Sequence, residues 1–272
     1  MQWRKNSMMN TILLEQDEIK TCSCDHSLKI KFIPKNELFT VNILKIHIKE
    51  NTEIFIDGIQ EHCKLKMIYK IDPNVQVKIF DLRKLKDCKI QEEYYLEQNS
   101  NLQFIKFYEG EEVKKQDNIY LNGNGANLSY LLKTIALKKQ KYQVIVHHQD
   151  HNTSCHIYHH GITKEEGALT FHITNLVENG KKNTIVNQQN KIITENQNLC
   201  KICPNLIVDE QDVIASHSAY LGDVNENELF YLQTRGISRK DARDLLIQGF
   251  LLEKIDFQFQ QKIKEKITFD WR

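Results

Sequence analysis

Residues 215–250, ASHSAYLGDVNENELFYLQTRGISRKDARDLLIQGF, carry the clearest structural pattern in this chain. This pattern predicts the end of a strand, a turn, and two short helices that meet at a glycine. Asn225 and Ser238 are suitable N-caps, and each is followed three positions later by an acidic residue, as in a capping box. We therefore expect a helical hairpin, with helices near residues 226–235 and 239–253.

Most of the chain before that stretch has the pattern of β-strands. Between residues 41 and 222, short runs of alternating apolar and polar residues are separated by polar turns. Many short strands with almost no proline suit a sandwich, a barrel or a β-helix, and the pattern does not separate these folds. No sequence repeat is evident, and residues 1–35 are interpreted as a short, partly helical lead-in.

Composition argues against several classes of protein. The 37 Lys and Arg residues balance 36 Asp and Glu residues, so the basic excess of a nucleic-acid-binding protein is absent. No apolar run approaches the ~20 residues of a membrane span, and the first residues lack the apolar core of a signal peptide. We therefore expect a soluble, cytoplasmic protein that binds neither nucleic acid nor membrane. The 7 cysteines are expected to be reduced thiols.

Nucleotide-binding and hydrolase motifs are also missing. The segment LNGNGANLS at residues 121–129 has only the first two glycines of a dinucleotide fingerprint, and neither a P-loop nor a nucleophile elbow occurs. No pair of carboxylates stands out as acid–base machinery. We expect no catalytic residues and no ATP binding through a P-loop of this chain.

Histidines gather between residues 147 and 172, where a metal site is one interpretation. The HHxxH and CHxxHH spacings could place two imidazoles on one face of a strand, which a transition metal would accept. Alternation along a regular strand would put His156 and His160 on one side and Cys155 and His159 on the other. The other interpretation is a set of polar strand faces in contact with solvent.

Cysteines provide a weaker metal signal. Cys200 and Cys203 form a C-x-x-C, and Cys22 and Cys24 form a C-x-C. A zinc ribbon would need a second C-x-x-C pair, so structural or incidental thiols remain the alternative.

Four stretches, read in order, resemble landmarks of the SufB/SufD family of iron–sulfur cluster assembly proteins. They are LNGNGANLSYLL, VIVHHQDHNTSCHIYHHGI, NTIVNQQNKII and CPNLIVDEQDVIASHSAYLGDVNENELFYLQTRGI. The last stretch is the most specific, and the residues in it that fall on family positions are Pro204, His217, Gly222, Phe230, Tyr231, Arg235, Gly236 and Ile237. The resemblance covers residues 120–253, about half of the chain, and around His217 it is closer to SufD than to SufB.

The resemblance implies a mainly β fold, a right-handed parallel β-helix closed by a C-terminal helical hairpin. The corresponding division of the chain is a short N-terminal segment at residues 1–40, a β-helix core at 41–222 and a C-terminal helical domain at 223–272.

The same resemblance implies a scaffold subunit rather than an enzyme. SufD-like proteins pair with SufB through their β-helices and dock the ATPase SufC on the helical hairpin. The residues implicated in binding a SufC-like ATPase are Phe230, Tyr231, Arg235, Gly236 and Ile237.

His217 is the candidate for cluster assembly. It would face a SufB-like partner, or a second copy of this chain, near the end of the last strand. Its neutral imidazole could ligate iron or a transient iron–sulfur cluster, although no cofactor is expected to be held stably. At Ala215, where the resemblance leads us to expect a cysteine, no thiol is available. Cys200 and Cys203 lie upstream as weaker metal candidates.

Two other functions are compatible with these residues. One is a metal-dependent β-helix or cupin-like enzyme that uses the histidines at 147–172. The other is a structural family member that only holds SufC. Near-stoichiometric bound metal would favour the enzyme, and co-purification with a SufB-like partner would favour the scaffold.

Overall fold

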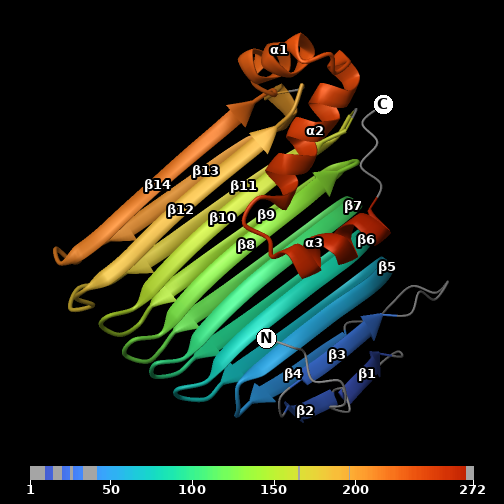
Figure 1. Ribbon diagram of the computed structural model, residues 1–272. Coiled ribbons are helices and arrows are strands. Elements are labelled where there is room, and N and C mark those ends of the chain that lie inside the picture. The colour runs from blue at the N-terminus through green and yellow to red at the C-terminus, as the bar shows by residue number, and fades with distance from the viewer. Residues whose placement is uncertain are drawn as a thin grey trace.

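The chain folds as a parallel β-solenoid of about 7 turns, followed by 3 C-terminal helices. This computed structural model describes residues 10–14, 20–24, 27–32, 42–164, 166–195 and 197–267. In Figure 1 the strands run side by side as stacked rungs, and the helices lie at the C-terminal end and across the strands. The parallel β-helix expected from the resemblance is therefore confirmed.

The elements of the described residues, in chain order, are β1 (Asn10–Leu14), β2 (Lys20–Cys24), β3 (Ser27–Phe32), β4 (Asn42–Ile48), β5 (Thr52–Ile71), β6 (Gln76–Leu96), β7 (Asn101–Leu121), β8 (Asn127–Ala136), β9 (Lys139–His148), β10 (Ser154–Thr163), β11 (Ala168–Val177), β12 (Thr184–Ile193), the 3-10 turn η1 (Gln197–Leu199), β13 (Lys201–Val208), β14 (Val213–Gly222), α1 (Glu226–Thr234), α2 (Arg239–Leu252) and α3 (Phe257–Lys266). β1 pairs with β3, β2 pairs with β4, and β3 pairs with β5. The partly helical lead-in expected for residues 1–35 is therefore wrong for the described residues there.

Each full turn contributes strands to two parallel arrays, which we call sheet 1 and sheet 2. Sheet 1 contains β1, β3, the first halves of β5, β6 and β7, and then β8, β10, β12 and β14. Sheet 2 contains β2, β4, the second halves of β5, β6 and β7, and then β9, β11 and β13. The long strands serve both sheets because a left-handed residue separates their halves: His62, Asp87 or Glu112.

A rung of about 25 residues sets the stacking. Thr52 pairs in register with Val77, and Val77 pairs with Leu102, so equivalent positions recur every 25 residues. Later rungs are longer: Cys155 pairs with Val186, 31 residues further on. The repeat is one of backbone geometry, because the side chains differ from rung to rung, and this is why no sequence repeat is evident.

An asparagine ladder lies along the turns that join one rung to the next. Asn74, Asn99, Asn152 and Asn183 all have positive φ, which asparagine tolerates better than most residues. Nδ2 of Asn99 donates to Oδ1 of Asn74 at 3.2 Å, and Nδ2 of Asn183 donates to Oδ1 of Asn152 at 3.0 Å. These side-chain bonds tie neighbouring turns together.

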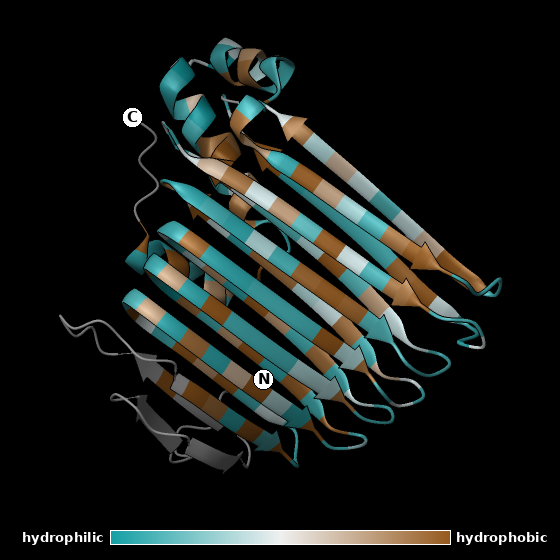
Figure 2. Cartoon of the chain, turned by 180° about the vertical axis from the view of Figure 1, so that it is seen from behind, coloured by the Kyte–Doolittle hydropathy of each residue, from teal (hydrophilic) through white to brown (hydrophobic). Residues whose placement is uncertain are grey.

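Two large apolar cores hold the solenoid and pack α2 and α3 against it. The first fills the solenoid, because alternate residues of each strand point inward, and Figure 2 shows the resulting bands of hydrophobic and hydrophilic residues. Stacked rings lie within it, such as Tyr69 and Tyr94 with centroids 4.6 Å apart. The second core lies outside sheet 1, where Phe107 and its neighbours are covered by Leu251 of α2 and Phe259 of α3.

The helical hairpin forms where the sequence predicts it. Asn225 and Ser238 cap α1 and α2 with their side chains, as expected. Gly236 has a φ of 84°, and the N–H of Ile237 donates to the carbonyl of Leu232, which completes a Schellman turn after α1.

α3 was not predicted. It begins at the N-cap Asp256 and buries only Phe259 and Ile263 of its own residues, so its apolar pattern is sparse. β14 ends at Gly222, while the division of the chain at residues 40 and 222 stays a prediction. Among the residues that the structure describes, no helix combines the length and the apolar character needed to cross a membrane.

Candidate functional site

The C-terminal end of the solenoid is open. Within the described chain, β13 pairs only with β11 and β14 pairs only with β12, so each strand leaves one edge without a neighbour. Residues 214–220 of β14 are all exposed. We define the mouth as the inward-facing residues of these two strands: Ile202, Pro204, Leu206, Val208, Ala215, His217, Ala219 and Leu221.

His217 lies in the mouth and faces the interior of the solenoid. Its register partner on β12 is Gln188, which is fully buried. In-register residues of parallel strands share a face, so the imidazole continues the inward column of Phe104, Tyr130, Ile157 and Gln188. No described rung covers it, and His217 is therefore exposed. An inward-facing yet accessible imidazole is suited to contact a molecule that closes the mouth.

A layer of buried polar residues lies directly below the mouth. This polar layer consists of His159, Asn175, Gln188 and Asn190. Each of them has at least one side-chain nitrogen or oxygen without a hydrogen-bond partner in the protein, and in His159 both ring nitrogens lack one. Buried polar groups without partners lower stability. The end of the solenoid therefore lacks, within this chain, hydrogen bonds that an ordinary core supplies to its buried polar groups.

Two aromatic rings flank the buried side chain of His159. Its ring lies edge-on to Tyr130, with centroids 5.3 Å apart, and tilted against Phe171 at 5.2 Å. Burial, with smaller contributions from His160 and Lys106, lowers the pKa of His159 to about 3. The imidazole is thus neutral at physiological pH.

The remaining histidines of the 147–172 group do not converge. His148 is buried, with Nδ1 2.8 Å from Oγ1 of Thr153, and burial lowers its pKa to about 4. His147 stacks on Tyr120 outside sheet 2, with centroids 4.7 Å apart. Within the described residues, no three His, Cys, Asp or Glu side chains are grouped so that they could hold a metal ion.

His160 lies outside sheet 1, beneath α2. It stacks on Phe250 with centroids 4.4 Å apart, and its Nδ1 is 2.6 Å from Nζ of Lys133. His160 points away from the interior whereas Cys155 and His159 point into it, which confirms the alternation expected along β10. Histidines on opposite sides of a sheet cannot serve one metal-dependent active site, so the described part of β10 does not bring its histidines together at one site.

The two cysteines of the C-x-x-C lie on opposite sides of sheet 2. Cys203 is in register with His172, an outward residue, whereas Cys200 is buried in the inner core. His217 belongs to sheet 1. The two thiols therefore do not chelate one ion together in this conformation, and the structure does not bring either of them into the mouth.

Three of the five residues implicated in ATPase binding form an exposed surface on α1. Phe230 is 68% exposed and Tyr231 is 56% exposed. The guanidinium of Arg235 lies 5.2 Å from the centre of the Tyr231 ring, and its Nη2 donates to the tyrosine oxygen at 3.2 Å. We call these three residues the hairpin surface. Ile237 instead packs between α1 and α2, and Gly236 ends α1.

The sequence pattern gave no indication of an ionic network in the interior of the middle rungs. Its members are fully or almost fully buried and comprise three cations and three carboxylates: Asp81, Arg83, Glu92, Lys106, Lys115 and Asp117. Arg83 Nε donates to Asp81 at 2.7 Å, and Lys106 Nζ donates to Glu92 at 2.7 Å and to Asp117 at 2.9 Å. The charges therefore cancel within the network.

Glu92 is the centre of this network. Burial alone would raise its pKa, but Lys106, Lys115 and Arg83 outweigh burial and hold the pKa of Glu92 well below its usual range. The Tyr94 hydroxyl donates to it as well, at 2.5 Å. The signal in the sequence was the placement of charged residues at inward positions of strands, visible only once the 25-residue register is known.

Comparison with known proteins agrees with this architecture. The family model described as SUF system FeS cluster assembly, SufBD core domain, matches residues 35–250. The iron–sulfur cluster assembly protein SufD of Bacillus subtilis (strain 168) is 28% identical over 114 residues, which cover 42% of this chain and 26% of that protein. SufB of the same organism is 25% identical over 126 residues, covering 44% and 26%.

A second SufD, from Escherichia coli (strain K12), is 31% identical over 64 residues, covering 24% of this chain and 15% of that protein. The alignments thus span about a quarter or less of these relatives' own length, and identity is somewhat higher to the two SufD proteins than to SufB. The family model covers most of the chain, from the residues before β4 to α2. The chain forms a solenoid with an open last rung and a C-terminal hairpin, and the family model matches most of its length. It therefore belongs to the SufBD family of the SUF iron–sulfur cluster assembly system.

Proposed function

We propose that this chain is a SufD-like scaffold subunit of an iron–sulfur cluster assembly complex. In this proposal a SufB-like chain pairs with the mouth, and a SufC-like ATPase docks on the hairpin surface. The chain carries no complete active site of its own. The observation that carries the proposal is the open end of the solenoid, where two strand edges, exposed apolar residues and an accessible histidine occur together.

The mouth has the chemistry of a protein interface. Unpaired edges of β-strands accept a further strand from another chain, which is a common mode of association. Around the mouth, Ile207 is 51% exposed and Ile214 is 72% exposed, so a partner would also bury apolar surface. A closing partner would reduce the solvent access of both strands.

The hairpin surface supports ATPase docking. Tyrosine and arginine are among the residue types that dominate binding energy at interfaces, and the aromatic rings of Phe230 and Tyr231 are unusually exposed for their size. Leu245 of α2 is 50% exposed as well. This hairpin is held by its own small core around Leu229 and Ala242, so its outer residues are free to bind.

His217 is the residue we propose to handle iron as cargo. A neutral imidazole nitrogen ligates iron, and its place in the mouth would bring it to the partner's side of the interface. Ala215, two residues earlier, has no ligating side chain. His217 would therefore act with ligands that the partner supplies, which fits a transient site rather than a resident cofactor.

The mouth is tested by co-expression with a SufB-like chain and a SufC-like ATPase, followed by affinity purification. Ala219→Arg places a bulky charge among the inward residues of the mouth, next to the unfinished edge. We expect recovery of the SufB-like chain to fall about tenfold or more, with ATPase binding retained. Undiminished recovery of the SufB-like chain would refute pairing through the mouth.

The hairpin surface is tested in the same complex with Phe230→Ala combined with Tyr231→Ala. We expect loss of the ATPase with the SufB-like chain still bound. Phe257→Ala is the matched control, because Phe257 is 72% exposed but lies on α3, away from the hairpin. Equal loss of ATPase in the control, or no loss in the double variant, would overturn this assignment.

A further inference from the structure

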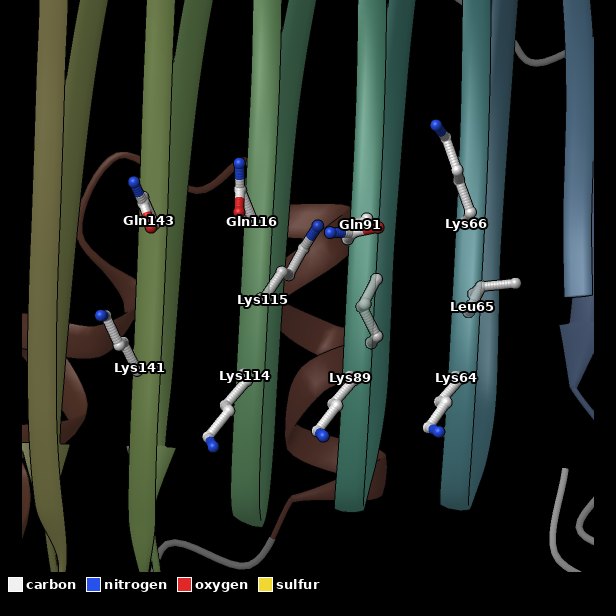
Figure 3. A pocket seen from close by; sticks show the side chains of 11 residues that line it. Lys64, Leu65, Lys66, Lys89, Gln91, Lys114, Lys115, Gln116, Lys141 and Gln143 are labelled. Atoms are coloured by element: carbon white, nitrogen blue, oxygen red, sulfur yellow. The ribbon is translucent and has the colours of Figure 1, made fainter. Parts of the chain in front are cut away.

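The outer face of sheet 2 carries a ladder of lysines. Lys64, Lys89, Lys114 and Lys141 are in-register partners on β5, β6, β7 and β9, and all four are exposed. Figure 3 shows them on adjacent strands of this face. We call them the lysine ladder. Its column continues through Thr170 to Lys201 on β13, at the open end.

The four ladder lysines make no ion pair within the described residues, unlike other lysines nearby. Lys66, two positions along β5, pairs with Glu93 at 2.8 Å, and Lys138 pairs with Glu111 at 2.8 Å. A different column of the same rungs alternates in sign: Lys86 stands between Glu61 and Glu111. Several lysines of these strands are therefore neutralised by a carboxylate, whereas the lysine ladder is a column of four cations with no carboxylate in it.

Stacked lysines repel one another. Neighbouring strands are ~4.8 Å apart, and like charges directly opposite each other destabilise a sheet. The formal net charge of the chain is only +1, so a general basic excess does not account for the column. A bound anion would relieve the repulsion.

Amides line the next outward column. Gln91, Gln116 and Gln143 are in register beside the ladder, and together the two columns border a shallow hollow of about 360 Å³. A glutamine amide both donates and accepts hydrogen bonds, whereas a lysine ammonium only donates. The α2 and α3 helices pack against sheet 1, so they do not cover this face.

We propose that the lysine ladder binds an acidic, extended segment of a partner protein. Lysines would pair with its carboxylates, and the glutamine amides would bond its peptide N–H and C=O groups. A phosphate polymer offers only acceptors and would use only the amide N–H groups, whereas a peptide would use the amide oxygens as well, which favours a peptide. The four lysines span ~14 Å, a length that about four residues of extended chain cover. This proposal goes beyond the proposed function and does not depend on it.

The test is the binding of a short fluorescent peptide of alternating Glu and Ser to the full chain, followed by anisotropy. The same peptide with Gln in place of Glu is the uncharged probe. Lys89→Glu with Lys114→Glu should weaken binding of the acidic peptide about tenfold or more. Lys182→Glu with Lys264→Glu, two exposed lysines elsewhere, makes the same change in net charge and should stay within about twofold. Lys89→Gln with Lys114→Gln gives a neutral variant if charge reversal perturbs folding, which circular dichroism reports.

Three outcomes would overturn the proposal. The acidic peptide binds no better than the uncharged one, the control variant weakens binding as much as the ladder variant, or inorganic polyphosphate binds the ladder more tightly than the peptide. The last outcome would assign the ladder to a phosphate ligand.

Discussion

The middle rungs and the mouth of this solenoid handle buried polar groups in opposite ways. Between β6 and β7, six buried charges cancel in a network in which every member is paired. Two rungs further on, the polar layer below the mouth keeps side-chain atoms without partners, and β14 above it is exposed on both faces. The same backbone repeat thus contains one region that is complete in a single chain and one that is not.

This contrast indicates which region of the molecule needs a partner. A buried network that satisfies all its members can specify a unique interior without help. Unpaired polar atoms next to an open strand edge instead need hydrogen-bond partners, which a second chain that closes the edge can supply. Four substitutions test this contrast, and they are ordered by the size of the expected effect.

Of the four substitutions, Glu92→Gln should produce the largest effect. It leaves Lys106, Lys115 and Arg83 with fewer carboxylates in a buried site, so we expect a loss of ~3–5 kcal/mol in the free energy of unfolding. Urea denaturation measures it. Glu93→Gln is the control, because its partner Lys66 is partly exposed, and it should lose at most ~1 kcal/mol. If the two variants are equally stable, the middle rungs do not depend on their network.

Acid should weaken the region near the mouth at pH values where Glu92 of the middle rungs, whose pKa is held low, is still ionised. Burial keeps His148, His159 and His160 neutral, with pKa values of about 4, 3 and 3, whereas the unfolded chain takes up these protons near pH 6.5. The three neutral histidines therefore contribute their full stability above about pH 6.5. This contribution is lost as the pH falls toward their folded pKa values of about 4, 3 and 3. We expect a loss on the order of 2 kcal/mol per histidine between pH 7 and pH 5.

His159→Phe isolates one of these contributions. Phenylalanine keeps the ring between Tyr130 and Phe171 but has no group to protonate, so urea midpoints should fall less between pH 7 and pH 5 than in the unmodified protein. His151→Phe, in an exposed turn, should retain the original pH dependence. An unchanged slope in His159→Phe would contradict the buried, neutral state of this ring.

Lys89→Glu should give a smaller effect of opposite sign. It places a carboxylate between Lys64 and Lys114, so we expect a gain of ~0.5 kcal/mol at low salt that shrinks at high salt. Lys86→Glu should lose a similar amount, because it stands between Glu61 and Glu111. Thermal midpoints of both variants decide the matter, and a shift of both in the same direction would show that cross-strand charge does not govern this face.

His217→Ala should have the smallest effect on folding. The side chain is exposed, so the free energy of unfolding should change by less than ~0.5 kcal/mol. Iron and sulfide recovered with the assembled complex should nevertheless fall clearly, with Ser218→Ala, its outward-facing neighbour, as control. A normal cluster content, or an unfolded variant, would remove His217 from the proposed site.

The sequence predicted some elements of this molecule well and others poorly, for physical reasons. Capping residues and a glycine made α1 and α2 readable, since these signals are local. α3 has a mainly polar sequence and is positioned by packing on Phe80, a contact between distant parts of the chain. The rung register was missed because inward positions alternate among isoleucine, aromatic and charged residues, although Asn74 and Asn99 already showed the spacing.

The candidate site was predictable only in part. The family-like motif pointed to His217, but its inward direction follows from the register with Gln188, which is not a local property of the sequence. The described residues form no group of three metal ligands from these histidines, because consecutive strand residues point to opposite sides of a sheet.

The asymmetric placement of buried charge also limits how the length of this solenoid can change. Removing residues 76–100 would bring Asn101 to the place of Gln76 and keep every later strand in register. The shortened interior, however, would hold Lys106 and Lys115 against Asp117 alone, one positive charge in excess. Duplicating residues 52–76 would add a rung whose buried polar residues are only Thr52 and Gln60. Adding a rung to this solenoid therefore leaves the buried charges balanced, whereas removing one does not. The rung of β5 is the one whose duplication would fit.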